Sequence, residues 1–201
     1  MSVLIIVRHG QSLYNLENRF TGWLDVDLSK KGIEEAHKAG KLLTGYKFDM
    51  AFTSTLKRAV VSLEIILYEI RQKNIPVEKN SALNERMYGD LQGLNKDELR
   101  KLYGDYQVKL WRKSYDVSPP NGESLKDTAS RVLPYWENKI VPELKAGKTI
   151  LICAHGNSIR ALRMHIEKLN KEQIVEIEVP TGIPKYYEFD ANMNILKTYY
   201  L

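Results

Sequence analysis

Two histidines in this chain each stand between an apolar run and a glycine. His9 follows residues 4–7 and Arg8, and His155 follows residues 150–154; Gly10 and Gly156 come next. Burying Arg8 beside the apolar run is costly unless an anion neutralises it. A neutral imidazole flanked by cations that bind phosphate oxygens can attack the phosphorus atom. One His-Gly pair alone would indicate a turn histidine, but the repeated pattern predicts phosphoryl transfer through His9.

Two further residues fit the same chemistry. Arg58 falls in the first turn of a predicted helix, from which it can reach the histidines. Glu85, just before a Tyr-Gly turn, is a candidate proton donor and acceptor for a substrate hydroxyl. The alternative for Glu85 is an ion pair with its neighbour Arg86, and the sequence leaves both open.

Several polar and basic residues could bind the rest of an anionic substrate. Lys96, Arg112 and Lys113 could hold a carboxylate or a second phosphate, although a solvated helix face is the ordinary explanation for such charges and is preferred from these residues alone. Residues 11–23 are expected to form a loop whose hydrogen-bond donors include Ser12, Asn15, Arg19, Thr21 and Gly22. His37 and His165 lie on predicted helices and are interpreted as structural. The four histidines lack metal-ligand spacing, so no metal is expected.

Alternating strands and helices must position these residues. Strands are expected up to His9, over 49–54, over 77–83, up to His155, and as a final pair within 184–201. Helices are expected over 29–43, 56–70, 97–114, 124–140 and 159–169, the first capped by Ser29 with Ile33, Ala36, Ala39 and Leu43 on its buried face. This order predicts an α/β three-layer sandwich with a mostly parallel central sheet flanked by helices. If the strands before His9 and His155 are neighbours, both histidines lie at the sheet edge where such folds bind ligands.

Bulk properties limit the class of protein. The chain has 201 residues, 43% of them hydrophobic and 27% charged, with a net charge of +5, which suits one domain and favours small anionic partners over nucleic acid. Cys153 is the only cysteine, which indicates a reducing compartment. The first apolar stretch is too short for a signal peptide or a membrane span, so a cytoplasmic protein without membrane partners is expected.

The motifs resemble those of the bisphosphoglycerate-dependent phosphoglycerate mutases in the histidine phosphatase superfamily. The opening motif, residues 8–12 with Asn15, is typical of the superfamily, and residues 85–89 and 93–96 are more specific to the mutases. Matching blocks also occur at residues 20–23, 53–59, 111–112, 134–136, 154–158 and 180–184. The resemblance covers nearly the whole chain and implies one phosphoglycerate mutase-like catalytic domain over 1–201.

The resemblance implies a role for each candidate residue. His9 would be the phosphorylated nucleophile, Glu85 the general acid and base, and Arg8, Arg58 and His155 the groups around the transferred phosphoryl. The remaining substrate contacts would be Ser12, Asn15, Thr21, Gly22, Tyr88, Lys96, Arg112, Lys113, Gly156 and Asn157. The implied reaction interconverts 3-phosphoglycerate and 2-phosphoglycerate, with 2,3-bisphosphoglycerate as the priming phosphoryl donor and no metal. The implied partners are small phosphoglycerates, and a monomer and a homodimer are both open.

The chain departs from the family pattern in two ways. Many members have a second arginine where Lys113 stands, and a lysine lacks the bidentate fork of an arginine. Pro120 is followed almost directly by Glu123, where many members have an insertion, and the C-terminal tail is short. A less covered phosphohistidine would admit water more easily, which raises phosphatase leakage as a hypothesis beside the mutase activity. The rival functions are a broad phosphatase, a bisphosphoglycerate synthase and a non-catalytic binding protein; the last would be expected to lack one of His9, Arg58, Glu85 or His155.

Overall fold

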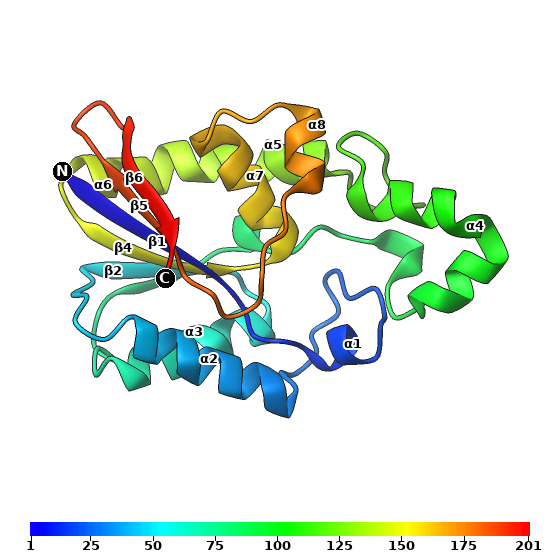
Figure 1. The fold of residues 1–201 in the computed structure, drawn as a ribbon, viewed down its shortest axis with the longest axis horizontal. Coiled ribbons are helices and arrows are strands. Elements are labelled where there is room, and N and C mark those ends of the chain that lie inside the picture. The colour runs from blue at the N-terminus through cyan, green and yellow to red at the C-terminus, as the bar shows by residue number, and fades with distance from the viewer.

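A six-stranded sheet forms the centre of the structure, a computed structural model that describes residues 1–201 (Figure 1). The strands are β1 Ser2–Arg8, β2 Met50–Thr53, β3 Val77–Lys79, β4 Thr149–Ala154, β5 Lys185–Phe189 and β6 Ile195–Tyr200. They lie in the order β3-β2-β4-β1-β5-β6. The first four in this order are mutually parallel, whereas β5 is antiparallel to both β1 and β6. The mostly parallel sheet predicted from the sequence is confirmed.

Helices cover both faces of this sheet. The helices are α1 Leu13–Leu16, α2 Lys30–Leu42, α3 Lys57–Glu69, α4 Lys96–Lys113, α5 Leu125–Tyr135, α6 Val141–Lys145, α7 Gly156–Ile166 and α8 Lys171–Glu176. Figure 1 shows α2 and α3 on one side of the sheet, α5, α6 and α7 on the other, and α4 projecting away from it. The arrangement is the expected three-layer sandwich.

The alternating side chains of β1 show how the layers are held together. Leu4 and Ile6 pack into the core shared with α5, α6 and α7, whereas Ile5 and Val7 pack into the core shared with α2 and α3. All four side chains are buried. A strand with apolar residues on both faces is typical of a parallel sheet covered on both sides, so the apolar run before Arg8 places β1 in the interior.

Helix capping explains where several helices begin. The side chain of Ser29 accepts a hydrogen bond from the N–H of Gly32 at the start of α2. Ser124 and Asp127 form a reciprocal capping box at the start of α5, as their spacing predicts. The buried face of this segment continues past α5 through a π-helical turn, Trp136–Ile140, into α6.

The structure corrects four details of the predicted elements. Ile33 is 41% exposed, because the buried face of α2 begins at Gly32. The strand expected over 77–83 ends at Lys79, since the side chain of Asn80 accepts from Ala82 N and starts a 3-10 turn. The loop expected over 11–23 contains α1, capped by Ser12. The helix over 97–114 is interrupted at Gly104, whose φ of 81° lies outside the helical region.

Candidate active site

His9 lies directly after β1, where two hydrogen bonds fix its position. Its backbone N–H donates to the carbonyl of Ala154 (3.0 Å), and Nδ1 of its ring lies 2.6 Å from the carbonyl oxygen of Gly10. A carbonyl oxygen can only accept, so Nδ1 carries the proton of the neutral ring. The lone pair is therefore on Nε2, which makes Nε2 the nucleophilic atom.

A close contact between two glycines holds the loop after His9. A Cβ atom on Gly10 would lie 2.0 Å from the carbonyl oxygen of Gly32, and a Cβ on Gly32 would lie 2.0 Å from the carbonyl oxygen of Gln11. Only glycine permits backbones to approach so closely. The first turn of α2 therefore packs directly on the backbone that accepts from His9.

His155 lies beside His9 at the end of β4. The parallel register pairs Arg8 with Ala154, and the two imidazole centroids are 4.9 Å apart with 60° between the ring planes. Nε2 of His155 is 2.7 Å from Oγ of Ser54, while Nδ1 is buried without a hydrogen-bond partner. The expectation that the two histidines meet at one sheet edge is confirmed.

Two arginines adjoin the histidines and are held by carbonyl groups. Arg8 donates from Nη1 to the carbonyl of Val179 (2.8 Å), and its buried Nε has no partner. Arg58 donates to the carbonyls of Gly22 (2.7 Å) and Leu24 (3.1 Å). Burial lowers the pKa of Arg58 to about 10, so the guanidinium remains charged at neutral pH. Carbonyls orient these cations without neutralising them, which leaves their charge available to an anion.

The surroundings of both histidines keep their rings neutral. Burial, and then the charges of Arg58 and Arg8, lower the pKa of His9 well below its ordinary value, outweighing the Gly10 carbonyl, which raises it. Burial and the charge of Arg58 likewise lower the pKa of His155. Each shift favours the unprotonated imidazole, the form required for attack on phosphorus.

Glu85 lies between the arginines and the start of α7. Its Oε1 accepts from the backbone N–H of Arg86 (2.9 Å) and from both N and Nδ2 of Asn157 (3.0 Å each). Burial alone would raise the pKa of Glu85, but the charges of Arg8 and Arg58 and the backbone hydrogen bonds lower it. Glu85 is therefore a carboxylate at neutral pH, able to accept a proton.

The proposed ion pair between Glu85 and Arg86 is not formed. The Arg86 guanidinium instead donates to Oη of Tyr88 (3.0 Å) and to the carbonyl of Arg112 (2.6 Å). The structural alternative raised for Glu85 is therefore wrong, and its side chain is directed toward the arginines and α7.

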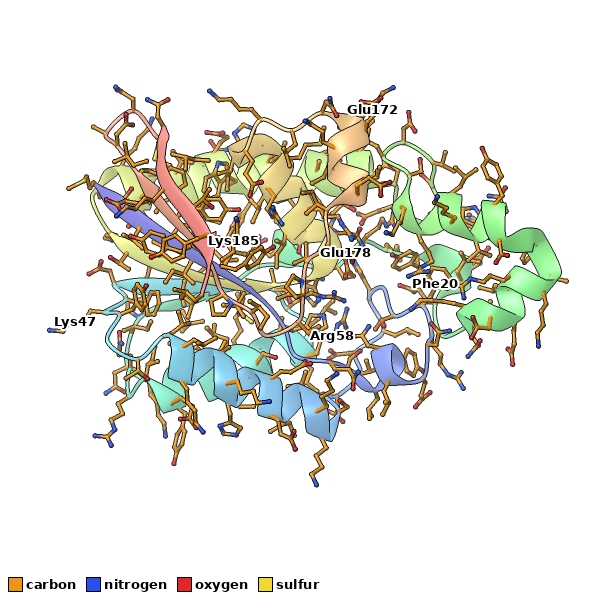
Figure 2. The ribbon with its side chains drawn as sticks, viewed as in Figure 1. Phe20, Lys47, Arg58, Glu172, Glu178 and Lys185 are labelled. Carbon is orange, nitrogen blue, oxygen red and sulfur yellow. The ribbon has the colours of Figure 1, made fainter.

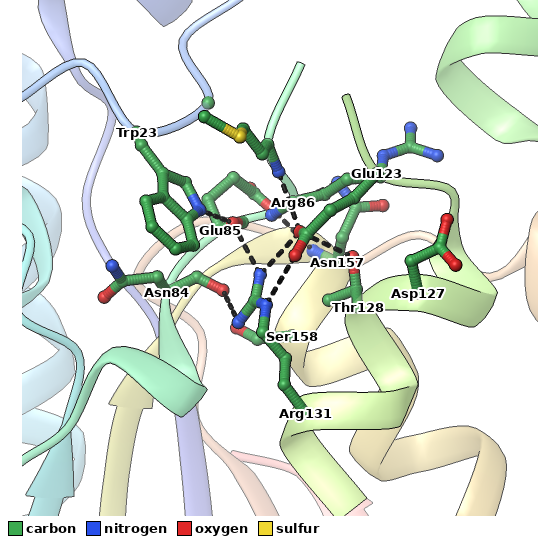
Figure 3. Close-up of polar contacts among 12 residues, drawn as sticks. Trp23, Asn84, Glu85, Arg86, Glu123, Asp127, Thr128, Arg131, Asn157 and Ser158 are labelled. Carbon is green, nitrogen blue, oxygen red and sulfur yellow. Dashed lines mark hydrogen bonds and ion pairs between the residues drawn. The ribbon is translucent and has the colours of Figure 1, made fainter. Parts of the chain in front are cut away.

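A network that the sequence did not indicate fixes the backbone of Glu85 (Figure 3). Arg131, on α5, donates to the carbonyls of Ala82, Asn84 and Glu85 at 2.8, 3.0 and 2.8 Å. The same guanidinium pairs with both carboxylate oxygens of Glu123 at 2.8 Å. The indole N–H of Trp23 donates to the carbonyl of Glu85 at 2.6 Å. Arg131 and Trp23 thus position Glu85, the proposed acid and base, by binding its backbone carbonyl rather than its carboxylate.

A cavity of about 160 Å³ opens beside these residues. Its lining includes eleven of the predicted site residues: Arg8, Asn15, Thr21, Gly22, Glu85, Tyr88, Lys96, Arg112, Lys113, Gly156 and Asn157. His9, Arg58 and His155 are buried next to this lining. Ser12 is outside it, because its side chain is fully buried and caps α1. A larger depression of about 570 Å³ along α3 and β3 has mainly apolar walls and contains no predicted site residue.

The cavity also contains residues absent from the predicted substrate contacts. Arg19, expected only as a donor in the loop, lies in the lining, and so do Phe20, Arg160 and Glu178. Arg160 has a detectable signal, since it stands one helical turn after Gly156 in a helix predicted to begin at the site. Glu178 has none, because nothing in its surrounding sequence connects it with the cavity.

Other parts of the molecule bear on the choice of chemistry. His37 pairs with Glu69 and His165 with Glu137, each on partly exposed helix surfaces away from the cavity. No group of three or more histidine, cysteine or acidic side chains is arranged to hold a metal ion. None of the helices is both long and apolar enough to cross a bilayer.

Comparisons with known proteins identify the family of the chain. The family model of the histidine phosphatase superfamily, branch 1, matches residues 4–200. The 2,3-bisphosphoglycerate-dependent phosphoglycerate mutase of Cytophaga hutchinsonii is 53% identical over 201 residues, which are 100% of this chain and 94% of that protein.

Solved structures show the same fold at lower identity. A phosphoglycerate mutase from Bacillus anthracis superposes with a TM-score of 0.77 at 22% identity, over 93% of this chain and 88% of that one. A mycobacterial glucosyl-3-phosphoglycerate phosphatase superposes with a TM-score of 0.83 at 24% identity, over 100% and 97% of the two chains. The fold, the family model and the 53% identity together show that the chain belongs to the histidine phosphatase superfamily, in the family of the 2,3-bisphosphoglycerate-dependent phosphoglycerate mutases.

Proposed function

We propose that this enzyme interconverts 3-phosphoglycerate and 2-phosphoglycerate through a phosphohistidine on His9. The observation that supports this most directly is the position of the neutral His9 ring, which lies among Arg8, Arg58 and His155 with the ionised Glu85 beside them. A nucleophile, an anion clamp and a base are the parts that phosphoryl exchange between two hydroxyls requires.

The residues act in each transfer as follows. Glu85 takes the proton of the attacking substrate hydroxyl, whose oxygen bonds to phosphorus as the bond to His9 Nε2 breaks and its electron pair returns to the ring. In the opposite direction Nε2 attacks phosphorus, the phosphorus–oxygen bond breaks, and the leaving oxygen receives the proton from Glu85. Arg8 and Arg58 stabilise the charge on the transferring phosphoryl oxygens in both directions.

The cavity fits the proposed priming donor, 2,3-bisphosphoglycerate. When bound, this donor supplies the phosphoryl group that charges His9. The buried Nε of Arg8, Nδ1 of His155 and Oγ1 of Thr21 lack hydrogen-bond partners, and buried polar atoms ordinarily have one. Cationic side chains outnumber acidic ones in the lining. Both features fit a multiply charged phosphate ester, and the expected substrate contacts are Asn15, Lys96, Arg112 and Lys113.

The assay that tests this function follows two products at once. Purified enzyme is given 3-phosphoglycerate with and without trace 2,3-bisphosphoglycerate, and 2-phosphoglycerate and free phosphate are both quantified. We expect fast isomerisation that depends on the bisphosphate, with little phosphate release. Phosphate release that outruns isomerisation would contradict the proposal and indicate a phosphatase, the outcome expected if water reaches the phosphohistidine.

Matched histidine variants complete this test. His9→Gln should lower isomerisation by at least ~1,000-fold and abolish the acid-labile, alkali-stable phosphate that the wild type acquires from the bisphosphate. His165→Gln is the control, because His165 is exposed and pairs only with Glu137. Equal labelling of the His9 variant and the wild type would place the phosphoryl group elsewhere.

We propose that residues 1–201 act as one catalytic domain, since a single sheet joins the elements that carry the site. A cytoplasmic location is proposed as well, supported by a lone cysteine that is buried and free. Monomer and homodimer both remain expected assemblies, which sedimentation measurements distinguish.

A further inference from the structure

One acidic side chain in the cavity has no part in the mechanism. The cationic residues of the lining are Arg8, Arg19, Lys96, Arg112, Lys113 and Arg160, and its acidic residues are Glu85 and Glu178. Glu85 is required as a base. Glu178 places a second negative charge where a multiply charged anion must bind.

Glu178 neutralises a proposed substrate contact. It lies between α8 and β5, where Figure 2 labels it, and its Oε1 is 2.9 Å from Nζ of Lys113 at the end of α4. The Glu178 side chain is 75% exposed, so packing does not account for its position. The hydrogen bond to Lys113 lowers the pKa of Glu178, which keeps its charge in place at neutral pH. Lys113 is therefore engaged by a carboxylate of the protein itself.

We propose that Glu178 is a specificity-determining residue that weakens anion binding in this cavity, most strongly for the most highly charged ligand. This inference rests on the proposed function. Glu178 acts in two ways: it occupies Lys113, and it repels the ligand directly. Repulsion between charges increases with the charge of the ligand, so the bisphosphate is disfavoured more than the monophosphates.

Weaker binding of the bisphosphate favours its turning over and its release in the proposed reaction. The bisphosphate must present either phosphate to His9 and must also dissociate. Binding ground state and transition state equally tightly lowers KM without raising kcat. The Glu178 carboxylate, which faces the cationic side chains, weakens the binding of the ground state and the transition state alike.

The test is Glu178→Gln, which removes the charge and preserves the shape. Calorimetry with 2,3-bisphosphoglycerate, 3-phosphoglycerate and inorganic phosphate should show tighter binding, by about three- to tenfold for the bisphosphate and less for the other two, because a solvated ion pair has a modest effect. The gain should shrink at high salt. Loss of folding cannot produce tighter binding, so the result is independent of stability.

Two further variants separate position from charge. Glu176→Gln makes the same charge change two residues away, outside the cavity lining, and should leave all three affinities unchanged. In a Lys113→Gln background the gain from Glu178→Gln should fall, because Lys113 can no longer be released. An equal gain in Glu176→Gln would reduce the effect to net charge and overturn the proposal.

The outcomes distinguish this inference from the proposed function. Isomerisation with unchanged or weaker binding in Glu178→Gln overturns the inference and leaves the function intact. Tighter anion binding without isomerisation in any variant supports the role of Glu178 and counts against the function.

Discussion

The imidazole rings of His9 and His155 lie edge to face, with 4.9 Å between their centroids. Two protonated rings at this distance would repel each other inside a site that already contains Arg8 and Arg58. The site tolerates the pair because neither ring is charged, and that neutrality makes one of them a nucleophile. The neutral state of the two rings therefore explains both their close approach and the nucleophilicity of His9.

We expect both histidines to titrate below pH 6.5, the ordinary value for imidazole. Burial, Arg58 and Arg8 all lower the pKa of His9, so Arg58→Gln should raise it toward that value. NMR titration of the ring carbons measures both midpoints. A His9 midpoint at or above 6.5 in the wild type would contradict the electrostatics described here.

Lys96 should produce an alkaline limit to activity. Burial, and then the nearby charges of Arg112 and Arg8, lower the pKa of Lys96 to about 8. Above that pH the free enzyme loses a cation from the cavity, so kcat/KM for 3-phosphoglycerate should decline. Lys96→Arg retains its charge and should move the decline to higher pH, even if its absolute activity is lower. An unchanged profile in Lys96→Arg would show that another group sets the limit.

Arg131→Lys should lower kcat more than it raises KM. A lysine cannot reproduce both the bidentate pair with Glu123 and the hydrogen bonds to the carbonyls of Ala82, Asn84 and Glu85, so the backbone of Glu85 becomes less well positioned. We expect kcat to fall about tenfold, less than the roughly 10²–10⁴-fold that a whole general acid or base contributes, because Glu85 itself is retained. Added guanidinium should restore part of the activity of Arg131→Ala.

Arg163→Lys is the matched control for Arg131→Lys. Arg163 also forms a two-point ion pair, with Glu167, and its side chain is even more buried than that of Arg131, 6% against 20% exposed, but it lies away from the cavity lining. Its replacement should cost stability in urea unfolding and leave kcat unchanged. Equal losses of kcat in the two variants would mean that Arg131 serves only stability.

Gly32→Ala should lower both kcat and stability, although Gly32 does not line the cavity. The added Cβ would lie 2.0 Å from the carbonyl oxygen of Gln11, so α2 must move away from the loop that orients His9. Overpacking of this kind costs about 1–3 kcal/mol of unfolding free energy, and kcat should fall with it. Gly147→Ala is a useful comparison, because that Cβ meets nothing within 4 Å; it should destabilise through its positive φ and keep kcat.

The positions of His9 and His155 were predictable because each histidine directly follows a local sequence pattern that marks the end of a strand. An apolar run that ends in a polar residue and a glycine determines the end of a buried strand, and parallel neighbours align such ends. Capping residues such as Ser29 and Ser124 likewise act over three or four positions. The helix predicted over 56–70 carries Arg58 in the same way, whereas Glu85 is positioned by Arg131, Trp23 and Asn157 from distant segments.

What the sequence could not predict depends on contacts between distant segments. Glu178 enters the cavity only because the segment after α8 crosses the end of α4. Ile33 is exposed because Gly32 has to approach Gln11, which no helical periodicity encodes. The third strand differs, because it ends at Lys79 for a local reason: the Asn80 side chain accepts from Ala82 N and starts a 3-10 turn.

The pairing of Arg8 with Ala154 has a consequence for how activity is acquired during folding. The two histidines follow strands that are far apart in the sequence, β1 at the N-terminus and β4 at Thr149–Ala154, and Glu85 is held by a helix from a third region. Contacts so distant in sequence are slow to form, because forming them closes long loops at an entropic cost. A partly folded chain therefore exposes no activated imidazole, and return of turnover after dilution from denaturant marks the completion of the sheet.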